Sequence, residues 1–168
     1  TYGIEFLVEK IHAFTGISID KYAVFTPESA AAFFDKIGPV TYTLKCDMNS
    51  VNDSRGISIN IKSGSQKFDG KKAVDLLRFY DYDSVNVEKA DVLSGFLKRM
   101  IKKITDGFTY DEMYDIISSV SKTVFGRCEL DYEQIKVICN MDKFDLKIFE
   151  LSGEEQLIGS EKYFIPNE

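Results

Sequence analysis

Helix-type and strand-type segments alternate along the whole chain, and no linker or repeat separates them. A chain of 168 residues with this pattern fits one domain that has a core of its own. Helices interleaved with strands pack on the faces of a sheet, because each element must bury its apolar side. We therefore predict a single α/β (α+β) domain over residues 1–168, with a central mixed β-sheet covered by helices.

The strands are predicted from β-branched and aromatic residues and from the alternation of apolar and polar positions. Four segments are expected in one sheet: Ile17–Phe25, Val40–Cys46, Ile57–Lys62 and Asp145–Leu151. Tyr163–Pro166 is expected as an edge strand, where a final proline is tolerated. Three polar segments are predicted as loops or turns: Asp47–Gly56, Gly64–Gly70 and Ser152–Gly159.

Apolar residues at helical spacing predict helices over Ile4–Phe14, after Pro27 as far as Gly38, and over Val87–Ile104. The last of these is expected to pack against the sheet. Thr109 and Glu112 have the spacing of a capping box at the start of another helix, and Asp131 is a candidate cap for a short one.

Charge and composition exclude several kinds of function. The net charge of -6 argues against nucleic-acid binding, which needs a basic surface. His12 is the single histidine and is expected on a helix surface, so a zinc site or a Ser–His pair has little support. Cys46, Cys128 and Cys139 show no CxxC spacing; the last two can pair in an oxidising compartment, and free thiols are the alternative.

The stretch GSQKFDGKKAVDLLRFYDYDS, Gly64 to Ser84, raises a specific question. A helix in its second half places Ala73, Leu76, Leu77 and Tyr80 on one face, and Arg78 points elsewhere. Arg78 is either a solvated charge paired with a nearby aspartate or one wall of a site that holds an anion.

Four segments of the chain together resemble the LytR-CpsA-Psr family of bacterial cell-envelope proteins. They are GISIDKYAVF, FFDKIGPVTYTLKCDM, INIKSGSQKFDGKKAVDLLRFYDYDS and the closing SGEEQLIGSEKYFIPNE. The first resembles the family's "GI-x-ID-x-Y" strand, the second its "GGV" to "DM" segment, the third the block that ends in "R-x-R", and the fourth its "yyIPd" tail. They stand in the family's order, and they place this chain on about the C-terminal two-thirds of the family domain.

The resemblance implies an activity at the cell surface. Such proteins typically have one N-terminal membrane anchor, with the domain outside the cytoplasmic membrane. They transfer an anionic glycopolymer, such as a teichoic acid, from a polyprenyl-pyrophosphate carrier to peptidoglycan. Arginines, acidic residues and Mg²⁺ bind the pyrophosphate, and an apolar tunnel holds the prenyl tail. Because this chain begins at Thr1, an excised domain without its anchor is expected.

Residue by residue, the resemblance implies a reduced pyrophosphate site. Arg78 matches the first arginine of the R-x-R pair, whereas Tyr80 stands where the second belongs. In the following "D-x-x-R-x-x-RQ" pattern only Asp83 and a positive charge, Lys89, are kept. The expected pyrophosphate-binding residues are therefore Arg78, Lys89 and Asp83, with no catalytic residue or metal ligand assigned. Either a preceding segment has been omitted, or the protein is a degenerate relative.

The prenyl tail would need an apolar wall. The candidate lipid-binding residues are Phe33, Phe34, Leu77, Phe96, Leu97 and Met100. Ordinary core packing is the alternative interpretation of the same residues.

The sequence and the resemblance together leave three candidate functions for this domain. The first is an extracytoplasmic domain that acts on polyprenyl-pyrophosphate-linked glycopolymer and peptidoglycan, close to the membrane surface through its anchor. The second is a non-catalytic relative that binds polyprenyl lipid or glycan as a sensor or scaffold. The third, a transcriptional regulator, conflicts with the acidic charge, and no nucleic-acid partner is expected.

Overall fold

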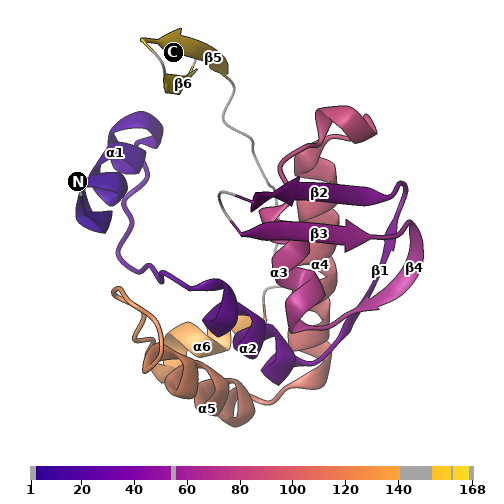
Figure 1. Ribbon diagram of the computed structural model, residues 1–168. Helices are drawn as coiled ribbons and strands as arrows, with labels where there is room; N and C mark the ends of the chain where they lie inside the picture. The colour runs from indigo at the N-terminus through magenta and orange to yellow at the C-terminus, as the bar shows by residue number, and fades with distance from the viewer. Residues whose placement is uncertain (1–2, 54–55, 141–152, 160, 167–168) are drawn as a thin grey trace.

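The computed structural model shows a mixed α+β fold (Figure 1), and it describes residues 3–53, 56–140, 153–159 and 161–166. Its elements follow one another in this order: α1 (Ile4–Thr15), α2 (Pro27–Ile37), β1 (Val40–Leu44), β2 (Met48–Asn52), β3 (Ile57–Ile61), β4 (Gly64–Phe68), α3 (Gly70–Arg78), the 3-10 turn η2 (Asp83–Val85), α4 (Lys89–Gly107), α5 (Tyr110–Ser121), α6 (Tyr132–Cys139), β5 (Gly153–Ile158) and β6 (Glu161–Pro166).

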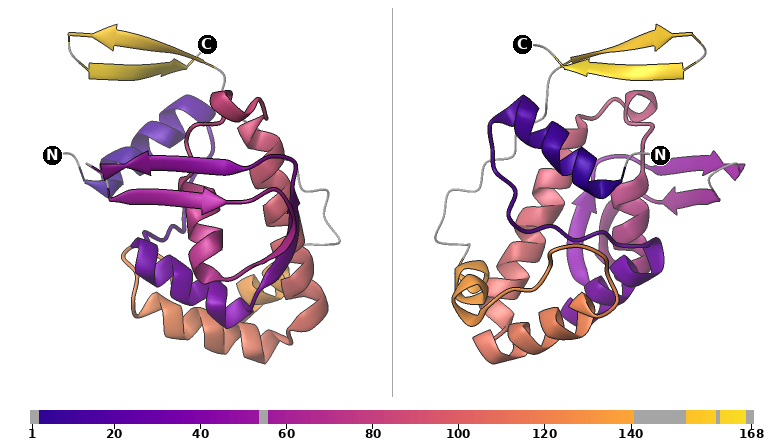
Figure 2. Two further views of the ribbon diagram at one scale, coloured as in Figure 1. Left: turned by 45° about the vertical axis from the view of Figure 1, so that its right-hand side comes forward. Right: turned by 90° about the vertical axis from the view of Figure 1, so that its left-hand side faces the viewer.

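A long, bent β-ribbon forms the middle of the molecule. β1 pairs with β4, from Val40↔Phe68 to Leu44↔Gly64, and β2 pairs with β3, from Met48↔Ile61 to Asn52↔Ile57; both pairs are antiparallel. Residues 45–47 separate β1 from β2, whereas only residues 62–63 separate β3 from β4. The additional residue acts as a β-bulge does and bends the ribbon between its two arms (Figure 2).

Hydrogen bonds of Asp47 stabilise this bend. Its carboxylate accepts hydrogen bonds from Lys62 Nζ at 2.9 Å and from the Ser63 backbone N–H at 2.8 Å. These contacts, first the one with Lys62 and then the one with Ser63, lower the pKa of Asp47 to about 2. Asp47 therefore stays ionised at any ordinary pH, and it links the two strands at the point where their regular pairing is interrupted.

The core lies between the ribbon and helices α3 and α4. Alternate residues of β3 are buried, and α4 contributes Phe96, Met100 and Ile104 to the same core. The ring of Phe96 lies 5.5 Å from the ring of Phe68 on β4. Helix α4 comes close to β1 at Gly95, where a Cβ atom would collide with the hydroxyl of Tyr42. The ribbon and α4 thus form one close-packed unit.

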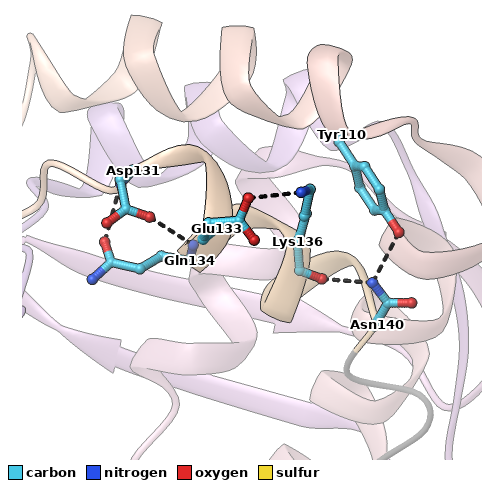
Figure 3. Close-up of polar contacts among 6 residues, drawn as sticks. All are labelled: Tyr110, Asp131, Glu133, Gln134, Lys136 and Asn140. Carbon is cyan, nitrogen blue, oxygen red and sulfur yellow. Dashed lines mark hydrogen bonds and ion pairs between the residues drawn. The ribbon is translucent and has the colours of Figure 1, made fainter.

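The remaining helices pack around this unit. Gly70, at the start of α3, lies so close to the Ala31 carbonyl of α2 that a side chain would not fit, and its N–H donates to Asp35 Oδ1 at 2.7 Å. On α5 and α6, Asn140 Nδ2 donates to the Tyr110 hydroxyl at 3.1 Å, as Figure 3 shows. Tertiary contacts therefore fix α3 against α2, and α6 against α5.

The mixed α+β class and most of the predicted helices are confirmed. The helix predicted over Ile4–Phe14 is α1, and the one that begins with Pro27 is α2. Both predicted helix starts are also present, because the capping box of Thr109 and Glu112 opens α5 and Asp131 caps α6. Figure 3 shows the second of these caps, in which Asp131 Oδ1 accepts from the Gln134 backbone N–H at 2.8 Å.

The single sheet was a wrong prediction, because the described strands form three two-stranded antiparallel sheets. Ile17–Phe25 is not a strand: it has one isolated bridge, from Val24 to Phe125, and Ile17 remains 64% exposed. β-branched composition alone does not make a strand when no neighbouring strand pairs with it. Asp145–Leu151 lies outside the described residues.

Three segments predicted as loops or turns contain strands instead. They hold β2, β4 and β5, in that order. Polar residues lower the strand propensity of β2 and β4. Each of these strands pairs with a neighbour in which buried and exposed residues alternate, β3 and β1 respectively. In β2, Met48 and Ser50 are buried whereas Asn49 and Val51 are exposed, so the period of two is present although Ser50 is polar. The predicted edge strand near the end of the chain is confirmed as β6.

Candidate functional site

Arg78 is the last residue of α3, and its position is well defined by its neighbours. The helix begins at Asp69, whose carboxylate accepts from the Lys72 N–H at 2.9 Å. Phe79, the residue after the helix, is 2% exposed, and its ring packs edge-on against that of Tyr82 with the ring centres 4.9 Å apart. Because this buried ring anchors the chain directly after the helix, Arg78 is held half-buried at one place on the surface.

A groove of about 330 Å³ runs alongside Arg78. One wall is a face of α3, on which Lys71, Val74, Asp75 and Arg78 follow one another at helical spacing. The opposite wall is the first part of α2, and the turn into β3 closes one side. The residues of these two elements that line the groove are Pro27, Glu28, Ala31, Gly56 and Ser58. The contact between Gly70 and Ala31 sets the distance between the two helices.

The groove contains two cations and two carboxylates, and they are not equally paired. Lys71 Nζ lies 2.7 Å from Asp75 Oδ2, so these two charges form an ion pair. Arg78 has no carboxylate oxygen within 4.0 Å among the residues that the structure describes. A half-buried guanidinium without an ion-pair partner is suited to bind an anion, because its planar fork donates two parallel hydrogen bonds.

Glu28 is the other carboxylate of the groove. Its pKa lies below the ordinary value because its own backbone N–H donates to the carboxylate, the Thr26 hydroxyl adds a second hydrogen bond, and Arg78 places a positive charge nearby. Glu28 is therefore ionised and is a weak proton acceptor. The groove is equipped for binding an anion, and the pKa of Glu28 is shifted away from the range that favours a general base.

The three predicted pyrophosphate-binding residues are not brought together in this groove. Lys89 is the first residue of α4, is exposed, and does not line the groove. Asp83 opens η2, and its side chain lies outside what the structure describes. Tyr80, which stands where the family has its second arginine, is 50% exposed and follows the end of α3. Of the predicted residues whose side chains the structure describes, Arg78 alone lines this groove.

Residues near Lys89 line a different cavity, of about 490 Å³, between β1 and the start of α4. Its walls include Glu88, the N-cap of α4, and Asp91 of the first turn, together with Lys45 and with Asn86, whose φ of 51° is left-handed. Two carboxylates and one lysine thus line this cavity, and Lys89 itself is not a lining residue.

The predicted lipid-binding residues also occupy different environments. Phe33 lines an apolar cavity of about 210 Å³ between α2, α5 and α6, and its ring lies 5.9 Å from that of Phe25. Phe96 and Met100 belong to the buried core, whereas Leu77 is 39% exposed. Phe34 and Leu97 are half-buried and do not line the apolar cavity.

Helix α2 separates the apolar cavity from the Arg78 groove. Phe25 lines the cavity, and Pro27, two residues further on, lines the groove. The two sites therefore lie on either side of the N-terminal part of α2. A ligand with a charged head and an apolar tail would lie across this helix end.

Lys71, Asp75 and Glu28 are site residues that the sequence reasoning did not find. Lys71 and Asp75 were detectable, because they stand at i and i+4 on the helix that carries Arg78 at i+7. Glu28 carries no comparable signal, because only the packing of α2 against α3 brings it to the groove.

Two further observations concern cofactors and cysteines. Within the described parts of the chain, no group of three or more His, Cys, Asp or Glu side chains is arranged to hold a metal ion. Cys46, Cys128 and Cys139 are all free thiols, so the structure has no disulfide bond between Cys128 and Cys139.

None of the described helices has the length and apolar character needed to cross a bilayer.

Several known proteins share the α+β fold of this chain. A crystal structure of a Streptococcus agalactiae protein superimposes with a TM-score of 0.77, at 17% identity, over 100% of this chain and 58% of its own. Bacillus subtilis TagV superimposes with a TM-score of 0.70, at 20% identity, over 98% of this chain and 65% of TagV. An uncharacterised Staphylococcus aureus protein is 21% identical over 95% of this chain and 40% of its own length.

Residues 1–168 match the LytR_cpsA_psr family, and the chain belongs to this family. Domains of the family are associated with the cell envelope and generally take part in attaching glycopolymers to the cell wall. The chain spans less than two thirds of the length of each of the three proteins named above.

Proposed function

We propose that this domain binds the pyrophosphate headgroup of a polyprenyl-linked glycopolymer in the Arg78 groove, and that it acts in the transfer of that polymer to peptidoglycan at the outer face of the membrane. The observation that supports this proposal is the state of Arg78, which is half-buried, lines a groove and has no ion-pair partner among the described residues. Membership of the family supplies the kind of substrate.

The physical argument begins with the charge of the ligand. A pyrophosphate carries concentrated negative charge, and a guanidinium binds two of its oxygens at once while keeping its own proton. The protein as a whole is acidic, with a net charge of -6, so an anion is attracted only where a local cation lacks a partner. Arg78 meets that condition, and Lys71 lies on the same wall of the groove.

The prenyl tail would extend from the groove past the start of α2 into the apolar cavity beside Phe33. At about 210 Å³ this cavity is smaller than the roughly 300–1,000 Å³ typical of ligand sites, so it would take only part of a long tail. Of the residues predicted for lipid binding, Phe33 is the one that this arrangement favours. Core packing explains Phe96 and Met100 without a ligand.

A second candidate is a non-catalytic domain that binds the same lipid as a sensor or scaffold. The groove favours this function in one respect: the pKa of Glu28 is lowered, which makes this carboxylate a poor acceptor for the proton of an attacking hydroxyl. Transfer of a lipid-linked polymer to peptidoglycan fragments by the purified protein would support the enzyme. Tight binding without transfer would support the sensor.

The binding proposal is tested by calorimetric titration with farnesyl pyrophosphate, a short-chain polyprenyl pyrophosphate. We expect Arg78→Ala to weaken binding about tenfold or more, because a charge-assisted contact typically contributes about 1.5–3 kcal/mol. Arg99→Ala is the matched control, since Arg99 is an exposed arginine of α4 outside the groove. Both variants should unfold at nearly the same temperature as the parent. If Arg78→Ala binds as well as Arg99→Ala, Arg78 is only a solvated charge.

A further inference from the structure

Lys71 and Arg78 form the two ends of the charged wall of the groove. They are seven residues apart on α3, which places them on the same face, about 10 Å apart along the helix axis. Both side chains are long, and the ammonium of Lys71 sits on a flexible stem of four carbons. The two charges can therefore converge on one ligand that lies between the helix ends, above Val74.

The ion pair of Lys71 is placed where it breaks easily. Its ammonium is 2.7 Å from Asp75 Oδ2, but the Lys71 side chain is 79% exposed. An exposed pair of this kind contributes little to stability, because water and salt screen it and two side chains must be held in one geometry. An entering polyanion competes for the same ammonium with more negative charge than Asp75 has.

Asp75 is the less exposed partner, at 16%, and it is itself a lining residue of the groove. When Lys71 turns to an anion, the Asp75 charge stays close to that anion and repels it. A ligand with a single phosphate gains the contact with Arg78, but the Asp75 carboxylate repels it if it also draws Lys71 away from Asp75. A ligand with two linked phosphates reaches both cations and offsets the repulsion.

We propose that Lys71 is the second phosphate contact of the groove, and that its ion-pair partner Asp75 makes the groove prefer two linked phosphates to one. This inference rests on the proposed function, since it assumes that the anion binds against Arg78. It assigns Lys71 the place of the second cation, in a protein where Tyr80 is exposed and Lys89 lies outside the groove.

The test is calorimetric titration without divalent metal, in which inorganic pyrophosphate and inorganic phosphate are the two probes. We expect Lys71→Ala to weaken pyrophosphate binding about tenfold, as for the loss of one charge-assisted contact, and to change phosphate binding much less. Asp75→Asn should strengthen the binding of both anions, and phosphate should gain more, so that the preference for two phosphates shrinks. Lys67→Ala is the matched control, because it removes an exposed lysine of β4 outside the groove.

The outcomes separate this inference from the proposal on which it rests. If Arg78→Ala loses pyrophosphate binding while Lys71→Ala equals the Lys67→Ala control, Lys71 has no role and the Arg78 site stands. If Arg78→Ala binds like the parent, the proposed site itself is wrong. If Lys71→Ala weakens phosphate and pyrophosphate equally, the preference does not come from Lys71. A Lys71→Met variant, which keeps an unbranched apolar chain of the same length as the lysine stem, guards against a loss caused by packing.

Discussion

Helices α4 and α1 have the same kind of sequence pattern and opposite surroundings. Both show apolar residues at helical spacing, and each carries a phenylalanine on its apolar side. Phe96 of α4 is 1% exposed and touches the aromatic rings of Tyr42 and Phe68. Phe14 of α1 is 61% exposed, and α1 has no buried residue at all. The pattern therefore predicts a helix reliably, but burial depends on a partner that the pattern does not name.

Two exposed polar contacts of Glu5 link α1 to Tyr22 and Arg127. The Tyr22 hydroxyl donates to Glu5 Oε1 at 2.6 Å, and the guanidinium of Arg127 lies 3.5 Å from Glu5 Oε2. Exposed contacts of this kind contribute little free energy. In α4, by contrast, dispersion and the hydrophobic effect act over a close-packed interface. We expect the two helices to respond very differently to the same substitution.

The largest effect is expected for Phe96→Ala. The substitution removes a fully buried ring between β4 and β1 and leaves a cavity, so the free energy of unfolding should fall by about 3–5 kcal/mol. Urea denaturation followed by circular dichroism measures this loss. Leu97→Ala, at the next position of the same helix and only half-buried, should cost clearly less. Equal losses for the two variants would mean that α4 is not oriented as described.

The contrast between α1 and α4 also explains how much of the fold could be predicted from the sequence. Local signals were sufficient for the helices: the Thr109–Glu112 box and the Asp131 cap act within one turn of chain, and they lie where the sequence placed them. Pairing partners are not local. The polar residues Ser65, Gln66 and Lys67 predict a turn, yet alignment with β1 makes β4 a strand. The composition of Ile17–Phe25 predicts a strand, yet within the described parts of the chain this segment has only an isolated bridge and no strand beside it.

The candidate site shows the same limit. Arg78 was found through resemblance to a family, and the structure places it in a groove. Lys71 and Asp75 were within reach of helix periodicity alone. Glu28 and Ser58 were not, because they arrive from α2 and β3 through tertiary packing at Gly70 and along the ribbon. The residues on the α3 wall of the groove can therefore be predicted from the sequence of that helix. The residues of the opposite wall cannot, because they depend on how α2 and β3 pack against it.

An intermediate effect that depends on pH is expected at the bend of the ribbon. The pKa of Asp47 is lowered to about 2 from 3.8, so its stabilising contribution is fully present above about pH 4 and is lost as the pH falls towards 2. Asp47→Asn removes the ionisable group. The difference in unfolding free energy between parent and variant should therefore be constant at neutral pH and shrink between pH 4 and pH 2. Urea denaturation at a series of pH values measures it, and a difference independent of pH would show that the charge does not fasten the bend.

The smallest effect is expected for Phe14→Ala, the counterpart of Phe96→Ala on α1. Removing an exposed ring leaves no cavity, and alanine has a higher helix propensity than phenylalanine, so the unfolding free energy should change by no more than about 0.5 kcal/mol. The measurement is the same urea titration, with the Phe96→Ala protein alongside. A loss above about 2 kcal/mol would place Phe14 in a packed interface. The contrast between α1 and α4 would then fail, because both phenylalanines would be buried in the folded protein.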